Sequence, residues 1–456
     1  MPRFLACPSR RFCFTRHLFT RHLFTRHLFT WLLFAGLLAS WSPLSANAAP
    51  GKDAERPPNI LFILADDVGV DAIGCYGGSS YPTPRIDALA KQGLRYEHGF
   101  SMPSCHPTRI TLLTGRYPFH LGHPKWGTFP KADEQKTVAH LLKKAGYATA
   151  IAGKWQLVLM KDEPDHIAKL GFDESCVFGW HEGPRYYEPM IYQNGKVRDD
   201  VKDRFGPDVY VEFLVDFMKR NRERPFFAYY SMALCHDVTD DLEAPVPFGP
   251  QGHYDTFVEM MQKMDERVGR IVDSVKELGL ADNTVIVFTG DNGTAFSYLH
   301  TAENGKYIRV PVFSMYHGEL IQGGKTKLTN GGTHVPLIVV GPHVQGGVTS
   351  DLVDFSDMLP TFAQLAGVPV PADWKVDGQS CARLWGDYEA KPRTWAFAEG
   401  SRGRAWVRTQ RYKLYTTGEF YDLVEDPKEQ TSLTQPSADA AAVQKELQAT
   451  LDTLGV

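Results

Sequence analysis

Five apolar runs constrain the fold of this chain more than any other feature of its sequence. They occupy residues 59–64, 147–151, 225–230, 284–288 and 335–340. A run of this length is typical of a strand that is buried on both faces of a parallel sheet. Segments with helical periodicity separate the runs, at residues 84–92, 137–144, 208–219 and about 254–278. This order predicts an α/β fold with a doubly wound, mostly parallel sheet.

The alternation of strands and helices stops after Pro369-Val370-Pro371. Residues 406–415 and 420–423 have the pattern of short antiparallel strands, and residues 438–451 that of an amphipathic helix. We therefore expect a large domain over residues 49–371. A small C-terminal α+β subdomain, built on an antiparallel sheet, is expected over residues 372–456.

The first 48 residues have the composition of a secretory signal peptide. They contain six Arg and no Asp or Glu, followed by the apolar run 31–39 and by Ala46-Asn47-Ala48, which has the small-x-small pattern of a cleavage site. A bilayer span needs about 20 apolar residues, so the nine-residue run is too short to cross one. We expect residues 1–48 to be removed, leaving a secreted or periplasmic protein without a stable membrane anchor.

Removal of this segment makes the remaining chain acidic. The whole chain has 49 basic and 53 acidic residues, and without the six leader Arg the basic count is 43, for a net charge of −10 over residues 49–456. Such a balance argues against nucleic-acid binding. Five Cys remain, an odd number that does not form a disulfide framework and leaves at least one thiol for another use.

Polar side chains follow four of the predicted strands. They are Asp66 and Asp67, Lys154 and Gln156, His236, and Asp291 and Asn292. Ligands of open α/β sheets bind beyond the carboxyl ends of the strands, so we expect these groups to form one site. Three carboxylates and one amide supply only oxygen ligands, which favours Ca²⁺, with Mg²⁺ as the alternative.

A second candidate feature is the segment Ser104-Cys105-His106-Pro107-Thr108-Arg109. Pro107 suits the first turn of a helix that would continue to Thr114 and end at Gly115. Cys105 would then lie at a helix N-terminus, where an anion is favoured, with Arg109 one turn further on. The alternative is a buried, inert Cys.

Three cations and a possible proton donor belong to the same predicted edge. Arg109, Lys154 and Lys325 supply permanent charge, and His236 could protonate a leaving group. A bound metal beside several cations describes a pocket for a tetrahedral oxyanion.

These motifs resemble those of the type I sulfatases. Cys105-x-Pro-x-Arg109 with Leu113-Thr114-Gly115-Arg116 is similar to the signature by which that family's Cys is converted to formylglycine. The resemblance runs from about residue 59 to residue 433. It includes Asp66-Asp67, Gly153-Lys154-Trp155, Asp291-Asn292-Gly293, Asp357-Met358-Leu359-Pro360-Thr361, and Tyr421-Asp422-Leu423 with Asp426-Pro427.

The resemblance implies an alkaline phosphatase-like fold and a covalent mechanism. Cys105 would become 3-oxoalanine (formylglycine), whose hydrate binds one Ca²⁺ held together with Asp66, Asp67, Asp291 and Asn292. One hydroxyl of the hydrate would attack sulfur, and loss of the proton from the other would expel sulfate. The remaining roles implied are diol binding by Arg109, sulfate binding by Lys154 and Lys325, and protonation of the leaving alcohol by His236.

Three positions depart from the family pattern. Gln156 stands where the family has a His that contacts the diol, and an amide cannot act as a base. The loop after Lys325 reads Asn-Gly-Gly-Thr-His at residues 330–334 in place of the usual Glu-Gly-Gly-x-Arg, and Cys235 replaces a Pro before His236.

Function is therefore expected to be hydrolysis of a sulfate monoester on a sulfated small molecule or glycan, after action of a formylglycine-generating or radical maturase before folding. A phosphonate or phosphodiester hydrolase of the same superfamily is the alternative enzyme. A catalytically silent protein that binds sulfated glycans is the alternative from another class, motivated by Gln156. The aromatic and charged segment 180–187 is a candidate sugar subsite or an ordinary surface loop.

Overall fold

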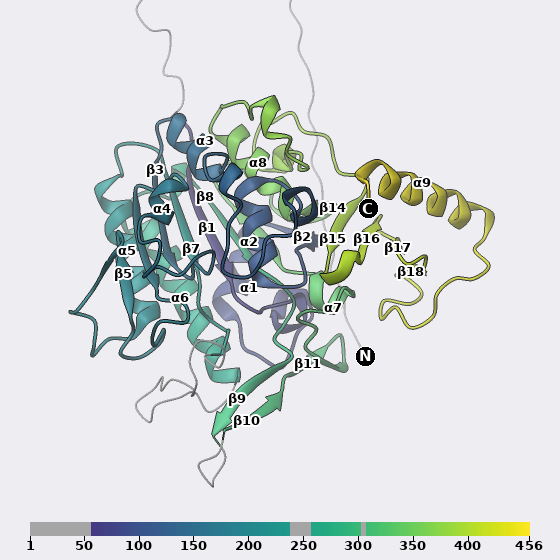
Figure 1. Cartoon of the computed structure of the whole chain (residues 1–456), viewed down its shortest axis with the longest axis horizontal. Helices are drawn as coiled ribbons and strands as arrows, with labels where there is room; N and C mark the ends of the chain where they lie inside the picture. The colour runs from purple at the N-terminus through teal and green to yellow at the C-terminus, as the bar shows by residue number, and fades with distance from the viewer. Residues whose placement is uncertain (1–55, 238–256, 302–306) are drawn as a thin grey trace, which may run out of the picture. The chain divides into compact units, whose positions relative to one another are not determined.

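A ten-stranded sheet runs through the centre of the computed structural model, which describes residues 56–237, 257–301 and 307–456 (Figure 1). The strand order is β14-β2-β13-β8-β1-β7-β3-β4-β5-β6. The strands are β1 Asn59–Ala65, β2 Leu94–Phe100, β3 Ala148–Gly153, β4 Glu174–Phe178, β5 Ile191–Gln193, β6 Lys196–Val197, β7 Phe226–Ser231, β8 Thr284–Gly290, β13 Leu337–Val340 and β14 Gly347–Asp354. From β8 to β4 every neighbouring pair is parallel, so the predicted mostly parallel α/β sheet is confirmed.

Antiparallel strands flank the parallel centre. β13 runs antiparallel to both β8 and β2, and β5 runs antiparallel to β4. The sequence predicted the strand at β13 but not its reversed direction, because an apolar run carries no information about strand polarity. It missed β2, β4, β5, β6 and β14, most of which lie toward the sheet edges and contain polar residues that interrupt any apolar run.

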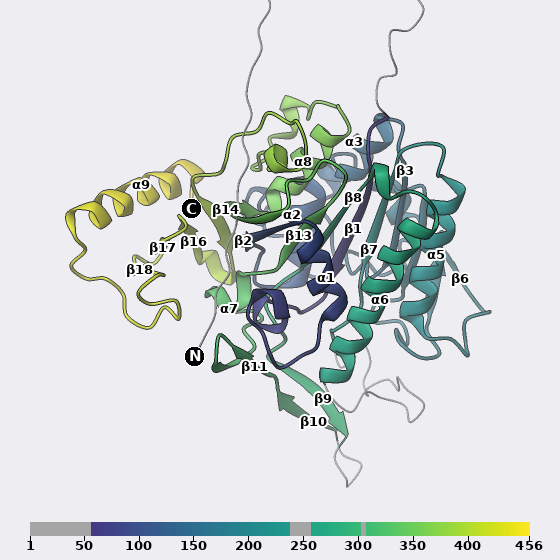
Figure 2. The same ribbon diagram turned by 180° about the vertical axis from the view of Figure 1, so that it is seen from behind.

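Helices cover both faces of the sheet, as the alternation of side chains along β1 requires. Leu61 and Ile63 pack in a cluster that also includes residues of α1 Pro84–Gln92, α5 Gly206–Arg220 and α6 Phe257–Glu277. Ile60 and Phe62 point to the other face, where α2 Cys105–Thr114, α3 Val138–Lys144, α4 His166–Lys169 and α8 Met358–Leu365 pack. Figure 2 shows α1, α5 and α6 together on one side of the sheet.

The helices agree with the predicted segments within a few residues. Pro84 begins α1, where a missing N–H leaves no helical bond unmade. Gly115 ends α2 in the left-handed conformation at φ +67°, as expected for a C-terminal Gly. The first residues of the segment predicted at about 254–278 lie outside the described residues, and α6 is described from Phe257.

A four-stranded antiparallel sheet lies near the C-terminus. Its order is β15-β16-β17-β18, from Ala396–Glu399, Ala405–Arg408, Tyr412–Tyr415 and Phe420–Asp422. Helix α9, Ala438–Leu454, packs against β16 and β17, with Leu447 and Leu451 in the same buried cluster as Trp406. The small C-terminal antiparallel sheet is therefore confirmed, while the boundary between residues 371 and 372 stays a prediction.

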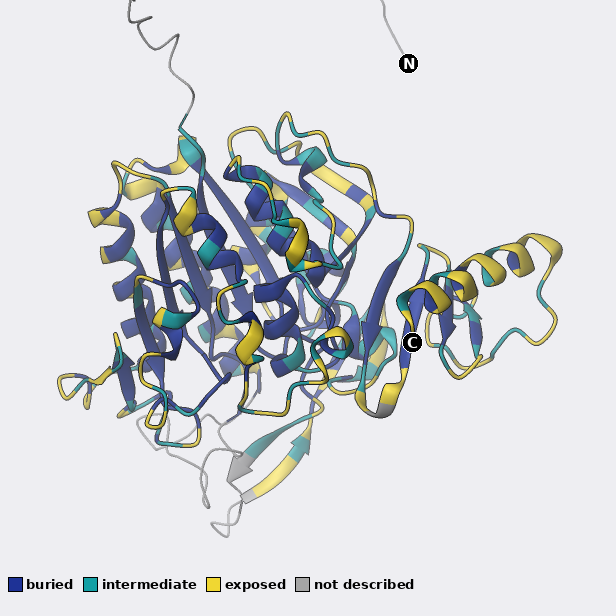
Figure 3. Ribbon diagram, turned by 45° about the horizontal axis from the view of Figure 1, so that its top comes forward, coloured by how far each residue is buried: buried dark blue, intermediate teal, exposed yellow. Residues whose placement is uncertain are grey.

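Short hairpins and a short helix complete the described chain. They are β9 Ser297–Thr301 with β10 Tyr307–Pro311, β11 Phe313–Tyr316 with β12 Glu319–Gln322, and α7 Asn330–Thr333. Within the described residues, no helix combines the length and apolar character needed to cross a membrane. The signal peptide predicted at residues 1–48 lies outside them. Figure 3 shows that the central strands are buried along most of their length.

Candidate active site

The pairs Asp66-Asp67 and Asp291-Asn292 lie side by side because the strands that precede them, β1 and β8, are neighbours. β1 and β8 pair in parallel with Ala65 opposite Gly290, so Asp66 and Asp291 leave the sheet at the same point. The N–H of Asp291 donates to the Ala65 carbonyl at 2.9 Å. Asp67 then turns away in the left-handed conformation, at φ +61°, and its N–H donates to Asp291 Oδ1 at 3.1 Å. The predicted convergence of these carboxylates is thus a consequence of the strand register.

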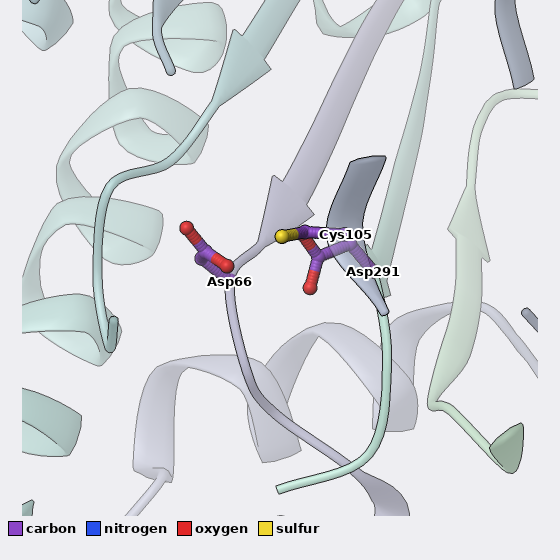
Figure 4. Close-up of side chains that lie close together, drawn as sticks. All are labelled: Asp66, Cys105 and Asp291. Carbon is purple, nitrogen blue, oxygen red and sulfur yellow. The ribbon is translucent and has the colours of Figure 1, made fainter. Parts of the chain in front are cut away.

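Cys105 is the first residue of α2 and reaches the same point. Its sulfur and one carboxylate oxygen each of Asp66 and Asp291 lie within 4.8 Å of one another, and Figure 4 shows the three side chains beside the end of β1. The predicted place of Cys105 at a helix N-terminus, with Pro107 in the first turn, agrees with the start of α2. Burial raises the pKa of the Cys105 thiol despite the nearby Lys154 and Lys325 ammonium groups. An unmodified Cys105 is therefore protonated and a poor nucleophile.

The oxygen set fits a hard cation. Asp66 Oδ1 and Asn292 Oδ1 are both buried and accept no hydrogen bond within the described part of the chain. Leaving a buried oxygen without a partner costs about 1–3 kcal/mol, and these two belong to the predicted ligand set. Asn292 Nδ2 donates to Asp67 Oδ1 at 2.9 Å, which directs Asn292 Oδ1 away from Asp67. The four residues can therefore hold a metal through carboxylate and amide oxygens, the donors that Ca²⁺ and Mg²⁺ prefer.

Three cations neutralise the three carboxylates. Lys154 Nζ lies 2.5 Å from Asp66 Oδ2, and Lys325 Nζ lies 2.8 Å from Asp67 Oδ2. Each lysine is thus held beside the aspartate with which it pairs. Burial disfavours the charge of Asp66, but the Lys154 ammonium and the other nearby cations together outweigh it, and the pKa of Asp66 is lowered. Burial opposes the charge of Lys325 too, yet Asp67 raises its pKa.

Arg109 completes this set from one turn inside α2. Its Nη2 donates to Asp291 Oδ2 at 2.7 Å, and its charge is buried with that of the carboxylate. Burial and the neighbouring Asp66 raise the pKa of Asp291, although Arg109 opposes them. A cation bound between these carboxylates would stabilise the ionised form of Asp291 and so lower its pKa.

Ser231 links two of these cations and was missed by sequence reasoning. Its hydroxyl donates to the Lys154 carbonyl at 2.6 Å and accepts a hydrogen bond from Arg109 Nη1. The N–H of Lys154 in turn donates to the Ser231 carbonyl at 2.7 Å. Ser231 is the last residue of β7, so the same rule that selected Asp66 and Asp291, a polar residue at the carboxyl end of a buried strand, would have found it.

Gln156 is buried in the same loop as Lys154. It adopts the left-handed conformation at φ +59°, and its Oε1 has no hydrogen-bond partner among the described residues. Trp155 fixes the loop, because its indole N–H donates to His166 Nδ1 at 3.1 Å beneath the surface. Gln156 therefore has a buried amide oxygen without a partner among the described residues, two positions after Lys154 in the chain.

His236 lies on the Asp67 side of the site. Its Nε2 is 4.0 Å from Asp67 Oδ2, and its Nδ1 is 2.5 Å from the Asp237 carbonyl, so Nδ1 carries the proton that it donates. Arg185 Nη1 lies 3.5 Å from the same ring nitrogen. Burial, with Lys325 and Lys154 nearby, lowers the pKa of His236 well below its usual value. The segment 180–187 thus reaches the site through Arg185. The sequence did not single out this residue.

A second acidic cluster does not have the chemistry of a metal site. Glu134, Glu163 and His166 place ligand atoms within 4.8 Å of one another. His166 Nδ1 accepts the Trp155 N–H, so in a neutral ring Nε2 carries the hydrogen and has no lone pair for a metal. Lys131 Nζ also lies 2.6 Å from Glu163 Oε2 and 3.1 Å from Glu134 Oε1, and supplies the balancing charge.

Comparisons with known proteins show which family the chain resembles. A model of the sulfatase family matches residues 58–368, and a model described as N-sulphoglucosamine sulphohydrolase, C-terminal, matches residues 324–456. N-acetylgalactosamine-6-sulfatase of Homo sapiens is 32% identical over 364 residues, covering 71% of this chain and 65% of that protein. Arylsulfatase A of Homo sapiens is 30% identical over 418 residues, covering 83% of this chain and 79% of that protein.

A solved structure extends the likeness to three dimensions. The crystal structure of Ps i-CgsB is 25% identical, with a TM-score of 0.69, and the match covers 88% of this chain and 93% of that chain. The chain therefore belongs to the sulfatase family, and its sheet is of the alkaline phosphatase-like type.

Proposed function

We propose that this protein hydrolyses sulfate monoesters of sulfated sugars, and aryl sulfates in the same site, through a formylglycine made from Cys105. One observation carries the proposal: Cys105 opens a buried helix within 4.8 Å of the Asp66 and Asp291 carboxylates. The family relationship and the names of the two human relatives support a sulfated sugar or an aryl sulfate as substrate. An aldehyde hydrate at position 105 would supply a nucleophile that the protonated thiol lacks.

The metal of this proposal is one Ca²⁺ per chain, held by Asp66, Asp67, Asp291 and Asn292 with position 105. When bound, it would supply Lewis-acid stabilisation of negative charge on oxygen. The partnerless Asp66 Oδ1 and Asn292 Oδ1 support this ligand set. The absence of Cys or His ligands other than position 105 favours Ca²⁺ over Zn²⁺, and Mg²⁺ is the alternative.

The chain's own residues divide the work on the sulfate group. Lys154 and Lys325 bind its oxygens, where their charges oppose the negative charge that develops during transfer. Arg109 orients position 105 from the next turn of α2 while it remains paired with Asp291. His236 protonates the leaving alcohol; the lowered pKa of its ring makes the imidazolium a strong acid once the sulfate anion has bound.

Gln156 occupies the position of a family His and limits the second step. Its amide can donate or accept a hydrogen bond, but it cannot take a proton from the hydrate near neutral pH. We propose that Gln156 orients a hydroxyl at position 105 and that another base removes the proton.

The burial of Cys105 bears on its maturation. Its side chain, at the first position of α2, is fully buried, so a converting enzyme could not reach it in the folded protein. We propose that a formylglycine-generating or radical maturase acts before folding, and that the protein is secreted or periplasmic once residues 1–48 are removed. The acidic net charge of the remaining chain argues against nucleic acid as a binding partner.

Mass spectrometry of the tryptic peptide that spans residues 96–109 tests the nucleophile. Protein from the native host should show the mass loss of thiol-to-aldehyde conversion at Cys105, and an unmodified thiol there would remove the central claim. Parallel assays with an aryl sulfate and an aryl phosphodiester test the reaction, since preference for the diester would assign the phosphodiesterase alternative. Binding of sulfated glycans with modified Cys105 but without turnover would assign the silent binding protein.

A further inference from the structure

A groove of about 600 Å³ is lined by residues that are direct chain neighbours of Cys105 and Lys325, among them Ser104, His106 and Thr326. Cys105, Lys154 and His236 are buried, whereas Lys325 keeps 18% of its side chain exposed. Thr326, the next residue, lines the groove, and its N–H donates to the Pro103 carbonyl at 2.7 Å. The groove wall therefore includes both the residue that follows the partly exposed Lys325 and the segment that leads into Cys105.

Trp126 is the exposed aromatic side chain of this groove. It is 54% exposed, whereas the other tryptophans of the described residues are buried or half-buried. Its ring stacks on that of His106, with centroids 5.4 Å apart and planes 23° apart. His106 directly follows Cys105 in α2, so the indole packs on the side chain next along the chain from Cys105.

Two contacts hold the loop that carries Trp126, one made by His106 and one by Trp180. His106 Nε2 lies 2.9 Å from the Thr128 carbonyl, which fixes the ring beneath the indole. Gly127 has a φ of +69°, and a Cβ there would lie 2.8 Å from the Trp180 ring, so the backbone packs closely on Trp180. An aromatic ring that is exposed and yet rigidly supported is suited to binding, because little conformational entropy is lost when a ligand covers it.

A polar pair, His123 and Glu399, also lines the groove. Glu399 Oε1 accepts the Phe119 N–H at 2.8 Å, and Glu399 Oε2 lies 3.3 Å from His123 Nδ1. Burial raises the pKa of Glu399 to about 7, so this carboxyl is partly protonated near neutral pH and repels an anionic ligand less than an ordinary carboxylate. His123 and Glu399 can each exchange hydrogen bonds with hydroxyl groups.

An aromatic face and a polar pair in one groove match the apolar face and the polar edge of a pyranose. The C–H bonds of one sugar face carry partial positive charge and favour the electron-rich face of an indole. The hydroxyl groups at the ring edge need hydrogen-bond partners. The groove also meets a second hollow of about 360 Å³, with which it shares Thr326, Gly400 and Ser401, and which leaves room for a further sugar.

We propose that the groove binds the pyranose ring of a sulfated sugar, with the apolar face of the ring on Trp126 and its hydroxyl groups toward His123 and Glu399. The inference rests on the proposed sulfatase function and assigns the sugar specificity of that site to Trp126. A small aryl sulfate needs only the sulfate-binding residues, so its turnover depends less on Trp126 than that of a sugar sulfate does.

The test compares Trp126→Ala, Trp126→Phe and the matched exposed control Val424→Ala with the matured wild type. Substrates are 4-nitrophenyl sulfate, N-acetylgalactosamine 6-sulfate, a panel of other O-sulfated hexoses and hexosamines with their oligosaccharides, and choline sulfate. For the best sugar sulfate, Trp126→Ala should lower kcat/KM at least tenfold more than for the aryl sulfate, through a raised KM. Trp126→Phe should recover most of the loss, and Val424→Ala should match the wild type.

Several outcomes would overturn the inference. An equal loss for sugar and aryl substrates would make Trp126 a structural residue, and turnover of the aryl or choline ester without any sugar sulfate would exclude a sugar site. Calorimetric titration of Cys105→Ala with the same sugar sulfates separates this inference from the proposed function. Binding that is lost when Trp126→Ala is added would support the groove even if the wild type hydrolysed no sulfate ester, and binding that survives this change would reject it.

Discussion

Arg109 Nη2 lies 2.7 Å from Asp291 Oδ2, and both side chains are almost fully buried. The pair joins the first turns of α2, where Cys105 lies, to the end of β8, where the proposed metal ligands Asp291 and Asn292 lie. Removal of one partner of such a buried ion pair strongly destabilises a protein, because the other charge stays buried without compensation. The helix carrying the nucleophile precursor is thus fixed relative to the oxygen ligands by a charge contact as well as by packing.

Replacement of the nucleophile precursor should abolish turnover. Cys105→Ala removes the thiol sulfur that conversion of the Cβ to the formylglycine aldehyde requires, and the small side chain leaves the packing of α2 almost unchanged. We expect no measurable aryl sulfate hydrolysis and a near-native melting temperature. Cys75→Ala, at a half-buried Cys away from this site, is the control that should keep activity. Undiminished activity of Cys105→Ala would contradict the mechanism.

Restoring the family residue at position 156 should not harm catalysis. His tolerates the left-handed backbone at φ +59° better than most residues, and it can take a proton that Gln156 cannot. In Gln156→His, kcat for an aryl sulfate should be unchanged or raised, up to about 100-fold if a general base is gained. Gln156→Leu, of similar size, controls for lost hydrogen bonding. A large loss in Gln156→His would show that the amide has a role of its own.

Ser231 should affect catalysis through the residues that it positions. Ser231→Ala leaves Arg109 Nη1 without its hydroxyl acceptor, at a cost of about 1–3 kcal/mol. We expect kcat to fall about tenfold or more, with KM less affected. Ser274→Ala is the control, because the buried Ser274 hydroxyl donates only within its own helix, to the Ile271 carbonyl. If both variants lost activity equally, the loss would reflect stability rather than position.

Calcium should stabilise the protein and be required for turnover. Removal by a chelator should abolish hydrolysis, and Ca²⁺ at about 100 times its Kd should add about 2.7 kcal/mol to the free energy of unfolding. Asn292→Leu should remove most of this stabilisation, since the partnerless Asn292 Oδ1 is one of the ligands. Glu163→Gln, in the second acidic cluster, should respond to calcium as the wild type does. A calcium response lost in Glu163→Gln and kept in Asn292→Leu would move the metal to the other cluster.

Stability should depend on pH through Glu399. Burial raises the pKa of this carboxyl from 4.5 to about 7 in the folded protein, so between these values the folded state binds more protons than the unfolded state. The contribution to the free energy of unfolding is therefore present below about pH 4.5 and is lost as the pH rises through 7. From pH 5 to pH 8, Glu399→Gln should gain about 1–3 kcal/mol relative to the wild type in urea unfolding. A difference that did not change with pH would contradict this assignment.

Much of the central sheet could be predicted because its strands are buried on both faces. Residues 59–64, 225–230 and 284–288 form uninterrupted apolar runs, and all three are parallel strands in the structure. β2 and β14 could not be predicted in this way, since Glu97, His98 and Ser350 interrupt their apolar pattern. The reversal of β13 depends on its pairing with β8 and β2, which local sequence does not encode.

Some residues of the candidate site could be predicted from the sequence, and others could not. Asp66, Asp291 and Lys154 could be selected because each follows a predicted strand, and the structure brings all three together with Cys105. Arg185 lies in a segment that gives no strand signal, and it reaches His236 only through the path of the chain between β4 and β5. Its place beside the catalytic edge therefore required the structure.

By itself, the sequence determined the class of fold, the residues at the strand ends and the Cys105-x-Pro-x-Arg109 signature, since hydrophobic periodicity and short motifs are local properties. The tertiary structure alone decided which charges meet. It paired Arg109 with Asp291, joined Arg109 to Lys154 through Ser231, and placed Trp126 against His106 beside the reaction centre. The physical reason is that pairing energies and burial depend on distances between residues far apart in the chain, and those distances are set only when the sheet register and the helix packing are complete.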